Sequence, residues 1–166
     1  MQHRIRNLLL ATMALGLLGS CAGMGMNDPI QARKDLMRAN GANLKAIGAY
    51  LKSGKGSASD VAARARKVAA SGGQMKSLFP KGTSSKDMPG KTRAKPAIWA
   101  KSSRHNQAEE MASFKLAADI MTAYANQVAT AAGSGNKGAI GAAMGKLGKS
   151  GCDGCHKDFR GPKPKK

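Results

Sequence analysis

Aromatic residues are scarce in this sequence, which has three Phe, two Tyr and one Trp among 166 residues. β-Sandwiches and barrels rely on aromatic and β-branched residues, so this scarcity argues against an all-β fold. Apolar runs are short as well, and none reaches the roughly 18 residues that a permanent membrane span requires. The hydrophobic fraction is nevertheless 42%, which supports a packed core and excludes disorder over the whole chain. The length predicts one domain, or one domain plus a processed segment.

Acidic residues are also few, because nine Asp and Glu stand against 28 Lys and Arg, for a formal net charge of +19. This balance favours an anionic partner, either an acidic protein or a membrane surface. We expect no nucleic-acid partner, because aromatic residues do not alternate with the basic ones as they do in stacking readers. The three cysteines cannot form a complete disulfide framework, since their number is odd.

The first 20 residues predict a secretory signal peptide rather than a buried N-terminal helix. Two arginines precede an apolar run over residues 8–18, and small residues follow it. The sequence leaves two alternative cleavage sites. The lipobox-like stretch at 18–21 would leave Cys21 as a lipid-modified N-terminus, whereas cleavage after Ala22 would remove Cys21. The predicted location is therefore the bacterial periplasm, in a soluble form or as a membrane-anchored lipoprotein.

After a short linker at 21–27, the pattern of apolar residues predicts four amphipathic helices. Helices of this kind predict an all-α fold, an antiparallel four-helix bundle over residues 28–160, followed by a basic tail at 161–166. The expected N-caps are Asp28, Ser57 or Ser59, Asn106 with Glu109 as capping-box partner, and Asn136.

Two stretches depart from this simple pattern. Residues 80–105 contain three prolines and are long for a plain connection, so we expect them to pack through Ile98 and Trp99 or to carry function. The fourth helix contains six glycines, each of which costs about 1 kcal/mol relative to alanine in a helix interior. Either close helix contact or a bound group must offset that cost.

Residues 152–156 form a C-x-x-C-H pattern, which is typical of covalent haem attachment. On a helix these residues share one face, so Cys152 and Cys155 can form thioethers to one porphyrin, with His156 as the proximal iron ligand. The alternatives are a zinc site, a redox-active dithiol and a plain disulfide. Zinc would need further ligands, and the mature chain has His105 as its one other histidine. A thioredoxin-like dithiol would need a βαβ setting, which the sequence does not indicate.

Residues 152–160, the segment at 96–99 and the first helix resemble the class II cytochromes c, the group of cytochrome c′ and cytochrome c-556. The resemblance covers about residues 28–161 and implies a four-helix bundle with one covalent haem c near the C-terminus. It also implies that Arg33 lies near a haem propionate and that Met37 lies one turn further on the same face. In the c-556 branch this methionine is the sixth iron ligand, whereas in cytochrome c′ it can leave the iron five-coordinate. The pattern at 36–41, Leu-Met-x-x-Asn-Gly, is more similar to c-556.

Three further side chains are candidates for haem contacts. Arg33 and Arg160 can hold the propionates, because arginine binds carboxylates through planar bidentate contacts. We expect Trp99 to pack at the haem edge. The alternatives are solvated surface charges for the arginines, a loop anchor for Trp99 and a core gap-filler for Met37.

We therefore expect a one-haem electron carrier, low-spin through His156 and Met37, and not an enzyme. Methionine–histidine ligation raises the reduction potential of haem iron, and this suits electron transfer. The alternative is a cytochrome c′-like protein that binds nitric oxide or carbon monoxide at five-coordinate iron. A third possibility is a haem-free basic lipoprotein that binds anionic surfaces. The expected partner is an acidic redox protein, and the sequence leaves monomer and homodimer open.

Overall fold

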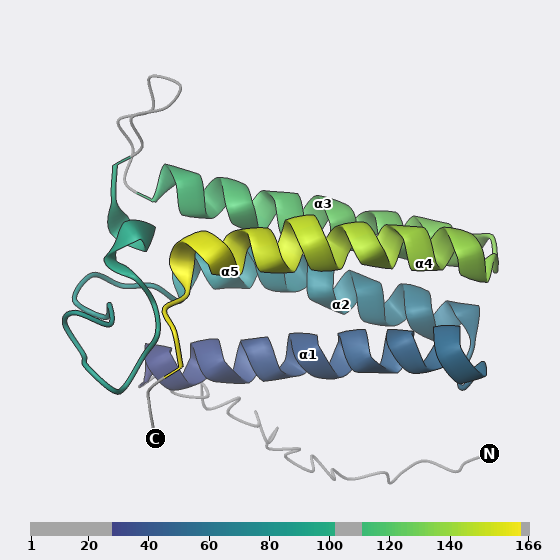
Figure 1. Ribbon diagram of the computed structural model, residues 1–166, viewed down its shortest axis with the longest axis horizontal. Helices are drawn as coiled ribbons and strands as arrows, with labels where there is room; N and C mark the ends of the chain where they lie inside the picture. The colour runs from purple at the N-terminus through teal and green to yellow at the C-terminus, as the bar shows by residue number, and fades with distance from the viewer. Residues whose placement is uncertain (1–27, 102–110, 164–166) are drawn as a thin grey trace, which may run out of the picture.

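Residues 28–101 and 111–163, the part of the chain that this computed structural model describes, form a bundle of helices (Figure 1). The helices are α1 (Pro29–Ser53), α2 (Ala58–Ser77), α3 (Ala112–Gly133) and α4 (Lys137–Lys146), and the last continues through η2 (Leu147–Asp153) into α5 (Gly154–Phe159). A short 3-10 helix, η1 (Pro96–Trp99), lies between α2 and α3. The expected all-α four-helix bundle is confirmed. In the described ranges, no helix has the length and apolar character needed to span a membrane.

Several expectations fall outside the described residues. They concern the signal peptide at 1–20, the linker at 21–27 with Cys21, the capping pair Asn106 and Glu109, and the last three residues of the basic tail. Within the described part, α3 begins at Ala112.

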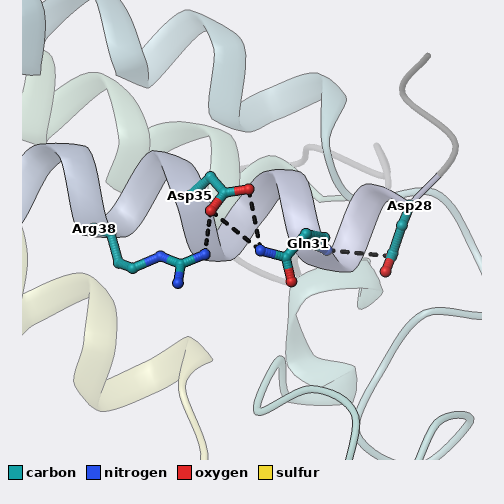
Figure 2. A network of polar contacts seen from close by, with 4 residues as sticks. All are labelled: Asp28, Gln31, Asp35 and Arg38. Atoms are coloured by element: carbon teal, nitrogen blue, oxygen red, sulfur yellow. Dashed lines mark hydrogen bonds and ion pairs between the residues drawn. The ribbon is translucent and has the colours of Figure 1, made fainter. Parts of the chain in front are cut away.

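Local sequence signals determine where α1 and α2 begin. The carboxylate of Asp28 accepts hydrogen bonds from the backbone N–H group of Ile30, at 2.8 Å, and from that of Gln31, at 3.2 Å. Figure 2 shows the second of these bonds. Ser57 and Asp60 form a reciprocal capping box at the start of α2. Each cap satisfies backbone donors that the helix itself cannot, so the expected N-caps Asp28 and Ser57 are confirmed.

Helix α1 has a polar outer stripe and an inner face. Gln31 donates to both carboxylate oxygens of Asp35 at 3.1 Å, and Arg38 forms an ion pair with the same carboxylate (Figure 2). These three side chains are exposed, so the network contributes little stability but keeps this stripe in solvent. Arg33 and Met37, which follow helical spacing on the other face, are buried and half-buried.

Helices α2 and α3 make the most extensive contact of the bundle, and small residues allow it. At Gly72, a Cβ atom would overlap the hydroxyl oxygen of Thr122 and lie 3.0 Å from the carbonyl oxygen of Ala118. Thr122 is held in place because its hydroxyl donates to that carbonyl at 3.0 Å. The other small buried residues of these two helices are Ala62, Ala65, Ala69, Ser71, Ala112, Ala118, Ala125, Ala129 and Ala132.

Helix α1 packs on α2, whereas α4, η2 and α5 pack on α3. At one end of the bundle α1 also approaches α4, where the ammonium group of Lys137 lies 5.3 Å from the ring centre of Tyr50. At the other end, no Cα atom of α1 lies within 8 Å of a Cα atom of η2 or α5. The bundle is therefore closed at one end and splayed at the end that carries the C-x-x-C-H residues.

The last helix is not the single regular helix that the apolar spacing predicts. Over η2 the backbone is π-helical, and the N–H of Gly154 donates to the carbonyl of Lys149, five residues earlier. Gly151 is buried, and a Cβ atom there would lie 3.3 Å from the Cα of Met121 on α3. One of the six glycines thus permits close helix contact, which is one of the two compensations that the sequence leaves open.

Two neighbouring glycines of α2 provide a test of the close α2–α3 packing. Gly72→Ala is expected to lower the free energy of unfolding by about 1–3 kcal/mol, because the new methyl group meets a fixed hydroxyl and a backbone carbonyl. Gly73→Ala, the matched control, has no atom within 4 Å of its new Cβ and is expected to raise that free energy by about 0.5–1 kcal/mol. Urea unfolding followed by circular dichroism measures both, and equal effects of the two substitutions would contradict the packing argument.

Candidate functional site

The C-x-x-C-H residues lie at the junction of η2 and α5. Cys152 is in the last turn of η2, and Cys155 and His156 are in the first turn of α5. All three side chains are half-buried, and both cysteines are free thiols. Burial is the main cause that raises the pKa of Cys155 to about 11, with the nearby Cys152 and Asp158 adding to it. Burial likewise raises the pKa of Cys152. Before haem is attached, both side chains are therefore protonated thiols near neutral pH.

The surroundings of His156 favour the neutral form of its imidazole. Burial lowers its pKa, and the positive charge of Arg160 lowers it further. The neutral form is the one that binds metal ions, so this surrounding suits His156 as an iron ligand. In residues 28–101 and 111–163, no group of three or more His, Cys, Asp or Glu comes together as a metal site.

Across the splayed end, Arg33 of α1 is a buried cation. Its guanidinium donates to the hydroxyl of Thr83 and to the Thr83 carbonyl, both at 3.2 Å, and its Cζ lies 4.5 Å from the ring centre of Phe79. Its side chain is 6% exposed, and burial lowers its pKa, although arginine stays charged at any physiological pH. Met37, one turn further along α1, is half-buried against the hydrophobic core.

An aromatic cluster connects the long connection to α3 and α5. The indole N–H of Trp99 donates to the carbonyl of Phe79 at 2.9 Å, and their ring centres are 6.1 Å apart. Phe79 packs edge-to-face against Phe114 with 4.6 Å between their ring centres, and Phe114 packs in the same way against Phe159 with 5.4 Å between ring centres. Trp99 thus holds the connection to the core, together with Ile98, which is fully buried.

A short strap, defined here as residues 93–95 paired with residues 159–161, ties the long connection to the C-terminus. Ala94 and Arg160 form an isolated antiparallel bridge. On either side of this bridge, the backbone N–H of Lys95 donates to the carbonyl of Phe159 at 3.0 Å, and the backbone N–H of Gly161 donates to the carbonyl of Arg93 at 2.7 Å. The side chain of Arg93 donates back to the Gly161 carbonyl at 2.8 Å. The strap begins three residues after His156 and fixes the backbone there.

The structure divides the predicted site residues between two sides of the splayed end. Arg33, Met37 and Trp99 belong to the side built by α1 and the long connection, and the C-x-x-C-H residues belong to the other. Arg160 lies on the strap with an exposed side chain, close enough to His156 for its charge to act there. Sequence reasoning missed Phe79, Thr83 and Arg93. Phe79 was visible as the last apolar residue of the second helical stripe, whereas a threonine and an arginine in a loop carry no such signal.

These residues fit a flat apolar group that carries negative charges. Apolar side chains on both sides of the splayed end are only partly buried, which shows that the protein core does not close over them. A buried guanidinium beside them offers hydrogen-bond donors to a carboxylate. The partly buried apolar residues concerned are Leu36, Met37, Cys152 and Cys155.

Residues 28–160 match the family model described as cytochrome C′. The chain belongs to the cytochrome c′ family. Its membership confirms the class II resemblance and shows that the cofactor is covalently attached haem c, so this chain is a haem c cytochrome. No curated protein sequence matches the chain.

Solved structures of the same family have the same fold. A cytochrome c′ with ligand-controlled dimer dissociation is 28% identical, with a TM-score of 0.66, and the match covers 81% of this chain and 95% of that chain. The cytochrome c′ from Thermochromatium tepidum is 27% identical at a TM-score of 0.64, with the same coverage. The oxidised cytochrome c556 from R. palustris is 25% identical at a TM-score of 0.66, covering 83% of this chain and 99% of that chain.

Replacing the two thiols tests whether they attach the haem. With a haem-attachment system present, the wild-type chain is expected to keep its colour through denaturation, because thioethers are covalent bonds. The double variant Cys152→Ser/Cys155→Ser is expected to lose all haem on denaturation, as measured by haem staining of denaturing gels. Retention of haem by the double variant would place the attachment elsewhere.

Proposed function

We propose that this cytochrome binds a small neutral gas, nitric oxide or carbon monoxide, at five-coordinate haem iron. The match to the cytochrome c′ family over residues 28–160 carries the proposal, because it spans every residue of the candidate site. It favours this alternative over the low-spin electron carrier that the sequence led us to expect. Proteins of this family carry electrons or bind gases and are generally not enzymes.

In this proposal the last helix holds the cofactor. The thiols of Cys152 and Cys155 form the thioether bonds, and the neutral imidazole of His156 binds the iron from one side. The strap supports this arrangement by fixing the backbone that follows His156. When attached, the haem supplies an iron atom with an open coordination position.

Arg33 is proposed to bind a haem propionate. Its guanidinium has five N–H donors, and its hydrogen bonds to Thr83 hold it in one orientation. The positive charge is buried, so an anionic group beside it would relieve an electrostatic cost. The proposed role of Arg160 shifts toward His156, whose pKa its charge lowers. Trp99 is proposed to pack near the cofactor through its contact with Phe79.

Met37 separates the two candidate functions. In the gas-binding proposal its side chain borders the open coordination position without binding the iron. The second candidate is a low-spin electron carrier in which the Met37 thioether is the sixth ligand. The match to a cytochrome c556 and the position of Met37, one turn after Arg33, favour this second candidate.

Absorption spectra of the holoprotein decide between the two functions. We expect high-spin spectra in both oxidation states that Met37→Ala leaves unchanged. The affinity for carbon monoxide is expected to rise in this variant, about tenfold if the side chain costs the gas about 1.4 kcal/mol of binding free energy. Met144→Ala, which truncates a half-buried methionine on α4, is the matched control and should change neither measurement.

The opposite result has a distinct signature. A low-spin spectrum with a sulfur-to-iron charge-transfer band, lost in Met37→Ala and retained in Met144→Ala, would establish the electron carrier and overturn the gas-binding proposal.

We also propose a periplasmic location, which is that of cytochrome c′ family members. The signal peptide predicted at 1–20 from the sequence pattern supports it, and lipidation at Cys21 remains the proposed route to a membrane anchor. A cytochrome c′ among the structural relatives forms a dimer that its ligand dissociates. For this chain a homodimer is part of the proposal, with the splayed end left accessible to solvent.

The surroundings of the splayed end are basic, which supports an acidic redox partner. Exposed cations lie on the long connection and the C-terminal segment, where exposed carboxylates are few. A positive surface attracts an acidic partner at long range, and salt screens the attraction. The exposed basic residues of these segments are Lys81, Lys86, Lys91, Lys101, Lys157, Arg160 and Lys163.

Small-molecule oxidants of opposite charge test this surface. The oxidation rate with ferricyanide, an anion, is expected to fall about tenfold between roughly 10 mM and 500 mM salt. The rate with a cationic cobalt complex should rise or stay constant under the same conditions. Stopped-flow absorbance measures both, and the same salt dependence for both oxidants would refute electrostatic steering.

A further inference from the structure

The π-helical segment η2 lies between α4, which packs near the closed end, and α5, which carries Cys155 and His156; Cys152 is in the last turn of η2 itself. Helix α4 precedes it and α5 follows it without a break in direction (Figure 1). Its signature is the hydrogen bond from Gly154 N–H to the carbonyl of Lys149, five residues back. π-Helical turns are rare and occur frequently at functional sites.

The core explains why a regular helix would fail here. An α-helix turns by about 100° per residue, so residues 147 and 159 would point about 120° apart along an uninterrupted helix. Yet Leu147 is 0% exposed and Phe159 is 8% exposed, and both belong to the same core cluster. Phe159 is also fixed by its contact with Phe114. A π-helical turn takes up one extra residue, which reduces the angle to about 20°.

Close contact with α3 holds η2 at this position. The Gly151 Cα has no side chain, and a Cβ atom there would lie 3.3 Å from the Cα of Met121 and 3.1 Å from Cδ1 of Leu147. The backbone of η2 therefore rests directly on α3. The extra residue in η2 therefore changes the direction in which the side chains of α5 point relative to those of α4.

We propose that η2 is a positioning element for the cofactor, because its extra residue turns Cys155 and His156 by about 100° relative to α4. Without that turn, a chain of this length could bury Leu147 or present the attachment residues to the splayed end, but not both. The inference rests on the proposed attachment of haem at Cys152 and Cys155. It concerns the register of the helix, whichever gas or electron function the haem serves.

Opposite length changes at one position test this register. Deleting Ser150, whose side chain is exposed, removes the extra residue and allows a regular α-helix with the same downstream orientation. Inserting one alanine after Ser150 adds a further rotation of about 100°. We expect the deletion to keep wild-type haem yield and wild-type absorption spectra. The insertion is expected to lower the yield of covalent haem at least tenfold and to alter the spectrum of the remaining fraction.

The asymmetry between the two changes is the decisive result. In a regular helix, deletion and insertion would rotate the motif equally in opposite directions, so similar losses in both variants would overturn the proposal. Wild-type yield and spectra in both variants would overturn it as well. Circular dichroism identifies misfolding: if the insertion does not fold, the deletion alone decides, and loss of haem or of fold in the deletion overturns the proposal.

Thermal unfolding of the purified full-length proteins separates this inference from the proposed function. Wild-type protein that attaches no haem at Cys152 and Cys155 would refute the proposed attachment. The register can still be measured in that case, because the deletion should retain the wild-type midpoint and the insertion should lower it by displacing Phe159 from the core. Equal midpoints in the two variants would overturn the register proposal alone.

Discussion

The close packing of α2 against α3 is the constraint on which the rest of the structure depends. The backbones approach closely because glycine and alanine occupy the interface, with Gly72 against the Thr122 hydroxyl as the tightest point. This pair supports α1 on one helix and the last helix on the other. The two sides of the proposed haem site are positioned through this pair and through the long connection, which bonds to Arg33 of α1 and pairs with the residues that follow α5. A change in the α2–α3 spacing would therefore alter both sides together.

Most of the fold could be predicted because the chain places strong local signals at the helix ends. Asp28 followed by proline and the capping box at Ser57 start helices where the sequence indicates, and apolar residues recur at helical spacing between them. The attachment motif could be predicted for a different reason. Covalent haem chemistry requires two thiols and an imidazole at fixed spacing, and few other sites share that requirement.

The remainder depends on contacts that no local pattern encodes. The π-helical segment arises because Leu147 and Phe159 both belong to a single core, although a regular helix would turn them about 120° apart. Thr83 reaches Arg33 only because the long connection folds back over α1. In the last helix, Leu147, Gly151, Cys155 and Phe159 follow one another at intervals of four residues in the sequence. A regular helix was the simpler interpretation of this spacing.

The strap has a consequence for the order in which the molecule is completed. Arg93 and Gly161, which it joins, are 68 residues apart, so closing the strap carries the entropy cost of a long loop. Its few hydrogen bonds offset that cost most easily after α2 and α3 have packed and brought the two segments together. We therefore expect the strap to be the last part of this end of the bundle to close. The proposed attachment residues Cys152 and Cys155 would stay accessible to haem until it does.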